Sequence, residues 1–362
     1  KYPCPFAGVE LLCYTTCMAE EMTLSQERAR EPARPRLRQI EAHPIQHQGQ
    51  PMVLLRDPLQ LSDVTIAIPR PLAPLLAIMD GSRDGAALEA ALQVRAGVRL
   101  APGLLAKLVA DLDEACLLDN ERYATAREEL LRAYRDAPSR PACLNDTGFP
   151  SDAGGATAYL QAYVDGLSPG TQVQGTGTIR GLVSPHIDYG RGGPVYAEAW
   201  TAAAEAVRDA ELVILLGTDH QGSAGTLTLT NQSYATPWGV LPTDRDSVGA
   251  LARALGEENA FAEELHHRAE HSIELAAIWL HFVREGKPVP TVPILCGHFG
   301  DFVSGTIDPG QYEPFSAAIA ALGEVMQARR TLVVAAADLA HMGPAFGDPY
   351  GLDLVGQAQL RN

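Results

Sequence analysis

Four short apolar runs in the second half of the chain lack the polar–apolar alternation of half-exposed strands. They cover residues 179–184, 212–216, 292–295 and 332–336. Segments with a helical pattern accompany them, at 156–164, 197–209, 248–255, 272–284 and 314–329. Unbroken apolar strands separated by helices indicate a sheet that is covered on both faces. We therefore expect an α/β domain over residues 141–362, with a layered sheet flanked by helices.

The first half of the chain has a different pattern. Two β-prone runs, at 51–58 and 64–69, precede helical patterns at 71–79, 86–98, 104–118 and 121–135. This order predicts a small α+β module over residues 41–135 that is loosely similar to winged-helix domains. Residues 140–150 have the composition of a linker. The total of 362 residues suits two such domains.

The two ends of the chain differ from these domains. Residues 23–40 are rich in Arg, Glu and Pro, which is typical of a flexible arm. We expect residues 1–40 as a whole to be a flexible or non-native leader. Residues 351–362 resemble the start of a helix without a stop signal, so we also expect a truncated C-terminus.

The formal net charge of −16 argues against two classes of partner. A nucleic-acid-binding protein needs a basic face, and so does a protein that docks on an anionic membrane. No apolar run reaches the ~18 residues of a membrane-spanning helix, and no secretory signal is recognisable. The six cysteines form no CxxC pair. We expect a cytoplasmic protein that binds neither nucleic acid nor membrane.

Histidines stand just beyond three of the predicted strands: His186, His220 and His341. Ligands of open α/β sheets bind beyond the carboxyl ends of strands, and imidazole is a ligand for Zn, Fe and Cu. Asp219 and Asp338 precede two of these histidines and could bind a metal or orient the rings. The pattern predicts a metal or catalytic site. The alternative is that each histidine is a hydrogen-bonded structural residue.

A fourth histidine lies in the segment Glu270–Glu274, at the start of a predicted helix. His271 and Glu274 are three residues apart, so they would share one helix face and could act as an acid/base pair. A structural interpretation is also open. Ser272 would then be the N-cap, and the nearby carboxylate would offset the helix dipole.

Six sequence blocks, in order and spacing, resemble the Memo family, which includes the bacterial AmmeMemoRadiSam system protein B. The resemblance covers about residues 141–350 and leaves 41–135 outside. The blocks are SPHIDYG at 184–190, LLGTDH at 215–220, ATPW at 235–238, EHSIE at 270–274, VPIL at 292–295 and ADLAHMG at 337–343.

The resemblance implies a fold similar to class III extradiol dioxygenases, which hold a mononuclear non-haem iron. It places metal positions at His186 and His220, with His271 nearby in the pocket. The third ligand of the animal Memo protein is a cysteine, and this chain has Ala340 at that position. Either His341 or Asp338 then supplies the third ligand, or the site binds metal weakly or not at all.

Our first functional hypothesis is a metal-dependent oxidoreductase that acts on a small aromatic or polyol substrate. Iron or copper would be bound by His186, His220 and His341 as metal ligands. The predicted catalytic groups are His271 and Glu274 as acid/base residues or ring-orienting partners, with Asp188 or Tyr189 as polar groups lining the pocket.

The second hypothesis is a non-catalytic binding or adaptor protein. Its pocket would recognise a small molecule or a peptide, and the N-terminal module would present a partner. The family resemblance suggests a radical S-adenosylmethionine protein as that partner. Ala340 favours this hypothesis, whereas the four retained histidines favour the first.

Overall fold

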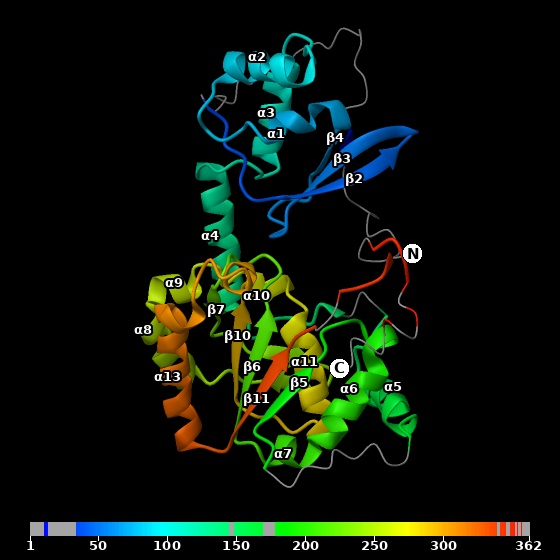
Figure 1. Ribbon diagram of the computed structural model, residues 1–362, viewed down its shortest axis with the longest axis vertical. Coiled ribbons are helices and arrows are strands. Elements are labelled where there is room, and N and C mark those ends of the chain that lie inside the picture. The colour runs from blue at the N-terminus through cyan, green and yellow to red at the C-terminus, as the bar shows by residue number, and fades with distance from the viewer. Residues whose placement is uncertain are drawn as a thin grey trace. The chain divides into compact units, whose positions relative to one another are not determined.

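The computed structural model describes residues 11–13, 34–144, 148–168, 178–338, 341–344, 348–351, 353 and 356. The chain forms two compact units, Lys1–Ala133 and Tyr134–Asn362, which are coloured along the chain in Figure 1. Most of the predicted leader at 1–40 lies outside the described residues, as does Ala340.

The first unit contains a four-stranded sheet in the order β1-β4-β3-β2. Strands β2 and β3 form an antiparallel hairpin, β4 pairs antiparallel with β3, and β1 pairs parallel with β4. Gln48 and Gly49 in the hairpin turn both have positive φ, which matches the twist of the strands. The strands are β1 (Leu11–Cys13), β2 (Glu41–His47), β3 (Gln50–Arg56) and β4 (Thr65–Pro69).

Short helices complete the core of this unit. Leu105, Leu108, Val109 and Leu112 repeat at the helical period, and this face of α3 is buried. Strand β2 was missed by the sequence analysis because its residues are polar and mostly exposed and include Pro44. The helices are η1 (Arg70–Leu72), α1 (Ala73–Leu76), α2 (Gly85–Ala96), α3 (Leu104–Glu114) and α4 (Glu121–Asp136), whose last residues belong to the second unit.

The second unit is built on a five-stranded sheet in the order β5-β11-β6-β10-β7. All neighbours pair in parallel except β7, which is antiparallel to β10. The α/β prediction is confirmed at the level of a mixed sheet flanked by helices. The strands are β5 (Gly181–Ser184), β6 (Leu212–Thr218), β7 (Leu227–Leu229), β10 (Thr291–Cys296) and β11 (Thr331–Ala336).

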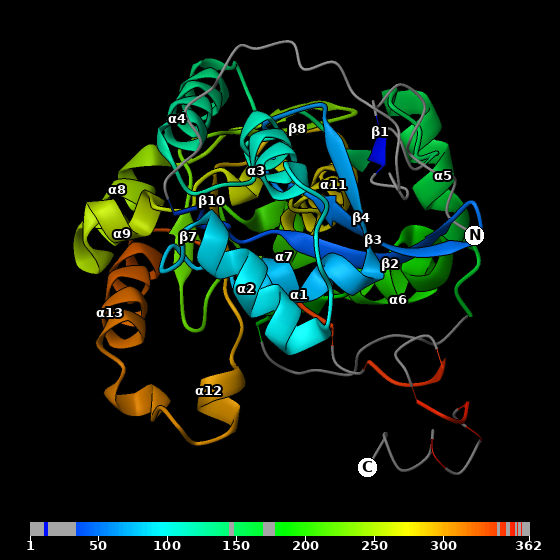
Figure 2. The same ribbon diagram turned by 90° about the horizontal axis from the view of Figure 1, so that it is seen from above.

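Helices cover both faces of this sheet (Figures 1 and 2). Val213 and Leu215 of β6 belong to a core that includes α5, α6, α7 and α11, and Leu212 and Ile214 pack with α8, α9 and α13 on the other face. Alternate residues of β6 are therefore buried on opposite faces of the sheet, which explains why the whole strand is apolar. The helices that cover the sheet are α5 (Ala153–Asp165), α6 (Tyr189–Ala202), α7 (Ala204–Asp209), α8 (Arg245–Leu255), α9 (Glu257–Phe261), α11 (Ser272–Val283) and α13 (Glu313–Ala328).

The remaining elements are short and lie in the connections of the second unit. Strands β8 and β9 form an antiparallel hairpin. None of the helices among the described residues is long and apolar enough to cross a membrane. These short elements are β8 (Tyr234–Thr236), β9 (Gly239–Leu241), α10 (His266–Ala269), α12 (Gly300–Val303) and η3 (Pro309–Gln311).

Two sequence predictions for this unit are wrong in detail. The helix predicted at 197–209 is two helices, and α6 already begins at Tyr189. Its first turns contain several glycines, which disfavour helix in isolation. Gly193 is needed there, because a β-carbon at that position would collide with the Tyr163 ring. The predicted linker at 140–150 is also not entirely a surface segment, since Arg140 is completely buried.

Gly217, near the end of β6, lets α11 approach the sheet closely. A β-carbon at this position would lie 2.7 Å from the hydroxyl oxygen of Ser272, and it would also overlap Ile273. We expect Gly217→Ala to lower the free energy of unfolding by about 1–3 kcal/mol, because overpacking forces neighbours to move. Urea denaturation measures this change.

Gly323→Ala in α13 is the matched control, because a β-carbon there has no atom within 4 Å. It should stabilise the protein by about 0.5–1 kcal/mol, since alanine is the better helix former. Equal effects of the two substitutions would contradict the close approach at Gly217.

Candidate metal centre

The carboxyl ends of three adjacent parallel strands bring ionisable side chains together. His186, Asp338 and His220 each stand two residues after the last residue of β5, β11 and β6, respectively. Because β11 lies between β5 and β6, all three side chains start from neighbouring points on the same sheet edge. His271 immediately precedes α11, which packs against β6 and β11.

The three histidine rings form a close cluster. Their centroids are 5.3 Å apart for His186 and His220, 5.9 Å for His186 and His271, and 5.0 Å for His220 and His271. His186 is buried, with 5% of its surface exposed, and the other two side chains are about half exposed. The cluster therefore combines a fixed inner ring with two rings that solvent or a ligand can reach.

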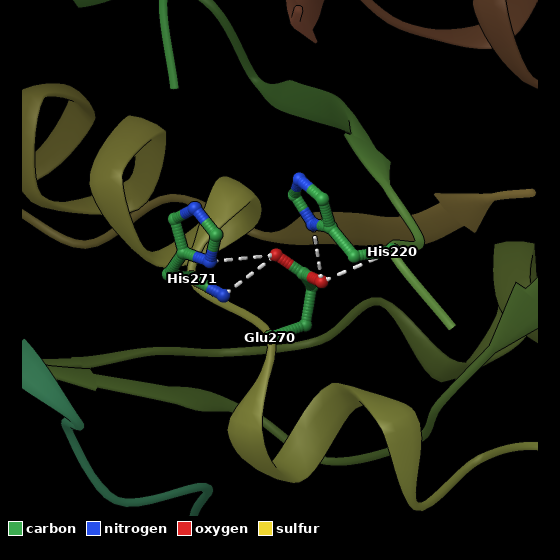
Figure 3. A group of neighbouring side chains, drawn as sticks. All are labelled: His220, Glu270 and His271. Carbon is green, nitrogen blue, oxygen red and sulfur yellow. Dashed lines mark hydrogen bonds and ion pairs between the residues drawn. The ribbon is translucent and has the colours of Figure 1, made fainter. Parts of the chain in front are cut away.

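Glu270 joins two of these rings through its carboxylate (Figure 3). Oε2 lies 2.9 Å from Nδ1 of His220, and Oε1 lies 3.1 Å from Nδ1 of His271. The amides of His271 and Ser272 also donate to Oε1, at 2.8 and 2.9 Å. Glu270 thus caps the start of α11, a role that the structural interpretation of the sequence assigned to Ser272. The Ser272 hydroxyl donates to the carbonyl of Thr218 instead.

His186 is oriented by the strand beside it. Its Nδ1 lies 3.2 Å from the carbonyl oxygen of Ala336, and its amide donates to Oδ1 of Asp338 at 3.2 Å. The other ring nitrogen, Nε2, lies 3.6 Å from Oδ2 of Asp338. A neutral imidazole has one N–H and one lone pair, and the N–H belongs on the side of the acceptor.

The same rule applies to all three rings, since each directs Nδ1 toward an acceptor. The neutral tautomer therefore carries its proton on Nδ1, and the lone pair is on Nε2. In Figure 3 the second ring nitrogens of His220 and His271 both lie on the side away from the carboxylate of Glu270. An acceptor on one ring nitrogen is the usual arrangement of histidines that bind metal through the other.

The environment shifts the pKa values in different directions. Burial lowers the pKa of His186, which favours its neutral form. The hydrogen bond with Glu270 raises the pKa of His220 despite partial burial. For Glu270, burial raises the pKa, but the hydrogen bonds and charges of His220 and His271 outweigh burial and hold it well below its usual range. Glu270 is therefore ionised and is not a proton donor near neutral pH.

Among the described residues, one group of possible metal-ligating atoms lies within 4.8 Å of one another, on His220, Glu270 and His271. Glu270 could bind a metal itself or orient the rings of His220 and His271, and its hydrogen bonds decide between these two roles. Both of its oxygens already accept from ring or main-chain N–H groups. We therefore interpret Glu270 as the group that orients the rings.

The other predicted site residues have different surroundings. Oε2 of Glu274 accepts from buried Arg140 at 2.5 Å, and Oε1 accepts from the amides of Cys143 and Leu144. Both oxygens of Glu274 are thus occupied by structural contacts, and its role as an acid/base residue or ring-orienting partner stays a prediction. Asp188 is half exposed, caps α6 through the amide of Arg191 and pairs with that side chain.

His341 lies at the exposed margin of the cluster. Its Nε2 is 3.6 Å from Oδ2 of Asp338, the same oxygen that lies near His186. A surface cavity of about 540 Å³ elsewhere in this unit is lined by residues such as Pro141, Thr236 and Pro237, and by none of the four histidines. The chemistry-bearing side chains thus do not coincide with that cavity.

Glu270 is a site residue that the sequence pattern did not predict, although it lies in the segment Glu270–Glu274 from which His271 and Glu274 were predicted. The signal was present, because Glu270 directly precedes His271. Spacing arguments favoured Glu274, since residues three apart share a helix face. Glu270 instead lies just before the helix, where its backbone is extended, and its side chain folds back over the first amides.

Comparison with known proteins identifies the family. The model of the Memo-like protein family matches residues 140–359, so the chain belongs to this family. A MEMO1 family protein of Aquifex aeolicus is 25% identical over 306 residues, which are 83% of this chain and 74% of that protein. The alignment is longer than the family match, so it extends into the residues before 140.

Two further relatives carry the same family name. The MEMO1 family protein of Thermus thermophilus is 30% identical over 271 residues, 74% of each chain. That of Methanopyrus kandleri is 31% identical over 170 residues, 46% of this chain and 55% of that protein. The matched part of these relatives therefore ranges from about half to three quarters of their length.

The hydrogen bond between Glu270 and His220 makes a pH-dependent prediction for the metal-free protein. In Glu270→Gln, we expect the pKa of His220 to fall, because the charged acceptor that raises it is removed. NMR titration of the ring proton measures this value.

The sign of the effect on stability follows from the raised pKa of His220. The contribution of His220 to the free energy of unfolding is complete below its pKa in the unfolded state. This contribution is lost as pH rises through its pKa in the folded state. The free energy of unfolding of the parent protein should therefore fall as pH rises through the folded-state pKa of His220. The variant Glu270→Gln should not show this fall. A His220 pKa that stays raised in the variant would show that Glu270 is not the cause.

Proposed function

We propose that this Memo-like protein binds one divalent transition metal, iron or copper, at the carboxyl edge of its sheet and uses it for an oxidation reaction. The observation that carries this proposal is the common orientation of the three rings. His186, His220 and His271 each have an acceptor at Nδ1, which leaves three Nε2 lone pairs within one cluster.

The spacing of the rings fits such a site. Imidazole nitrogens bind first-row metals at ~2.0–2.1 Å, so rings that share a tetrahedral ion have centres roughly 5 Å apart. The observed centroid distances of 5.0, 5.3 and 5.9 Å are close to this value. Asp338 adds a carboxylate oxygen 3.6 Å from Nε2 of His186. It is a candidate donor, and His341 beside it is the alternative.

The side chains of the cluster would divide the work in this proposal. The histidines would hold the ion through Nε2, and Glu270 would keep the protons of His220 and His271 on Nδ1. A bound iron or copper ion would supply the electron transfer and oxygen activation that protein side chains lack. The resemblance to class III extradiol dioxygenases suggests a small aromatic or polyol substrate. If the three histidines alone hold the ion, a coordination position remains for this substrate.

Metal content tests the binding part of the proposal. The protein, purified without a His tag under aerobic and anaerobic conditions, should contain close to one Fe or Cu per chain by elemental analysis. The double variant His186→Ala/His220→Ala should lose this metal while it retains its circular dichroism spectrum.

The control for this experiment is His43→Ala/His298→Ala, which removes two exposed histidines outside the cluster. It should retain the metal. Equal metal content in the cluster variant and the parent protein would contradict the assignment. If metal is present, oxygen uptake with catechol-like substrates tests the reaction.

A second function, a non-catalytic binding protein, is favoured by one observation. Position 340 has a methyl group where the family resemblance predicts a thiolate ligand. In this case the cluster would recognise a small molecule or peptide, in association with a radical S-adenosylmethionine protein. Absence of metal under both conditions, together with co-elution with such a protein in size-exclusion chromatography, would support this function over the first.

A further inference from the structure

Arg140 is a positive charge with no exposed surface. Its main chain pairs with strand β8, because its amide donates to the carbonyl of Ser233 and its carbonyl accepts from the amide of Ala235. The guanidinium carbon lies 4.9 Å from the centre of the Tyr234 ring. A charge at such a position is costly unless every donor finds an acceptor.

The acceptors of Arg140 come mainly from one short segment. Nε donates to the carbonyl of His267 at 2.7 Å, Nη2 to the carbonyl of Glu270 at 2.6 Å, and Nη1 to the carboxylate of Glu274 at 2.5 Å. These residues precede and begin α11, and the segment contains His271. The side chain therefore fixes the backbone that carries Glu270 and His271.

Glu274 also binds the main chain that follows Arg140. Its second oxygen accepts from the amides of Cys143 at 2.7 Å and Leu144 at 3.1 Å. The chain around Arg140 and the start of α11 thus hold each other through one ion pair and main-chain hydrogen bonds. We call the pair Arg140–Glu274 the clasp.

We propose that Arg140 is a positioning residue of the histidine cluster, which acts through the main chain of Glu270. The Glu270 carbonyl is bound by Arg140, and the carboxylate of the same residue holds the Nδ1 atoms of His220 and His271. Movement of this backbone would displace both rings together. The metal-affinity part of this inference rests on the proposed function, whereas the effect on the Glu270 hydrogen bonds does not.

If Arg140 had a merely structural role, its replacement would affect the stability of the fold and would not selectively affect the hydrogen bonds of Glu270. Buried ion pairs often contribute little net stability, and neutral replacements of both partners can be tolerated. The clasp variant Arg140→Met/Glu274→Gln removes both charges and keeps an oxygen for the amides of Cys143 and Leu144. It leaves the carbonyls of His267 and Glu270 without their donor.

The matched control is Arg135→Met/Glu264→Gln. Arg135 pairs with buried Glu264 at 2.6 Å, and Glu264 also accepts from the hydroxyl of Thr230. This variant likewise removes one Arg–Glu pair from the second unit. No hydrogen bond of Arg135 to the segment 267–274 is observed among the described residues, so the control reports the loss of a pair alone.

Amide hydrogen exchange in the metal-free protein is the first measurement. The amides of His271 and Ser272 donate to Glu270, so their protection reports its carboxylate. In the clasp variant we expect their protection to fall at least tenfold relative to the core amide of Leu215, and in the control to stay unchanged. If the clasp variant does not fold, Arg140→Lys, which keeps the charge, should show the same selective loss.

Unchanged protection of both amides in a folded clasp variant would overturn the inference. The second measurement is the dissociation constant for Fe(II) under anaerobic conditions, which should rise about tenfold in the clasp variant, as for other partners that orient metal ligands. If the parent protein binds no metal, the proposed function fails, and the exchange result alone still decides the role of Arg140.

Discussion

The carboxylate of Glu270 is the group on which the geometry of the site depends. It is buried, ionised and shared between two imidazoles and three main-chain amides. A buried carboxylate is costly unless it is paired and hydrogen-bonded, and here both oxygens are satisfied. The same contacts fix the tautomer of His220 and His271, because each ring must donate from Nδ1. One interaction therefore offsets the cost of burial and sets the direction of two Nε2 lone pairs.

The sheet provides the frame for this interaction. Parallel strands β5, β11 and β6 end at the same edge, and each contributes one side chain two residues later. Glu270 and His271 immediately precede helix α11, and the approach of this helix depends on Gly217, where any larger side chain would meet Ser272. Behind the cluster, Arg140 binds the carbonyl of Glu270. The rings are thus held by the carboxylate of Glu270, and the main chain of Glu270 is held by the buried guanidinium of Arg140.

The sequence was sufficient to predict four of the five strands of this sheet, all but β7, and the meeting of His186 and His220, because both follow from local pattern. Unbroken apolar runs indicate buried parallel strands, and residues after such strands share an edge. Glu270 and Arg140 required tertiary information. Glu270 acts from outside the helix, so helical spacing selected Glu274 in its place. Arg140 lies in a segment rich in Pro and small residues, and nothing in that composition indicates that its guanidinium is surrounded by carbonyls.

The donor chemistry of the cluster bears on which metal it would take. The position that the family resemblance assigns to a thiolate is Ala340, so the donors of the proposed site would be imidazole nitrogens and carboxylate oxygens. Soft thiolates favour Cu(I), whereas imidazole with carboxylate is the donor set of non-haem Fe(II) sites. His186 and Asp338 already place a nitrogen and an oxygen 3.6 Å apart, and His220 contributes a second ring. The residue at 340 therefore removes the one ligand that would favour reduced copper, and the proposal stays with divalent iron or copper bound by imidazole and carboxylate side chains.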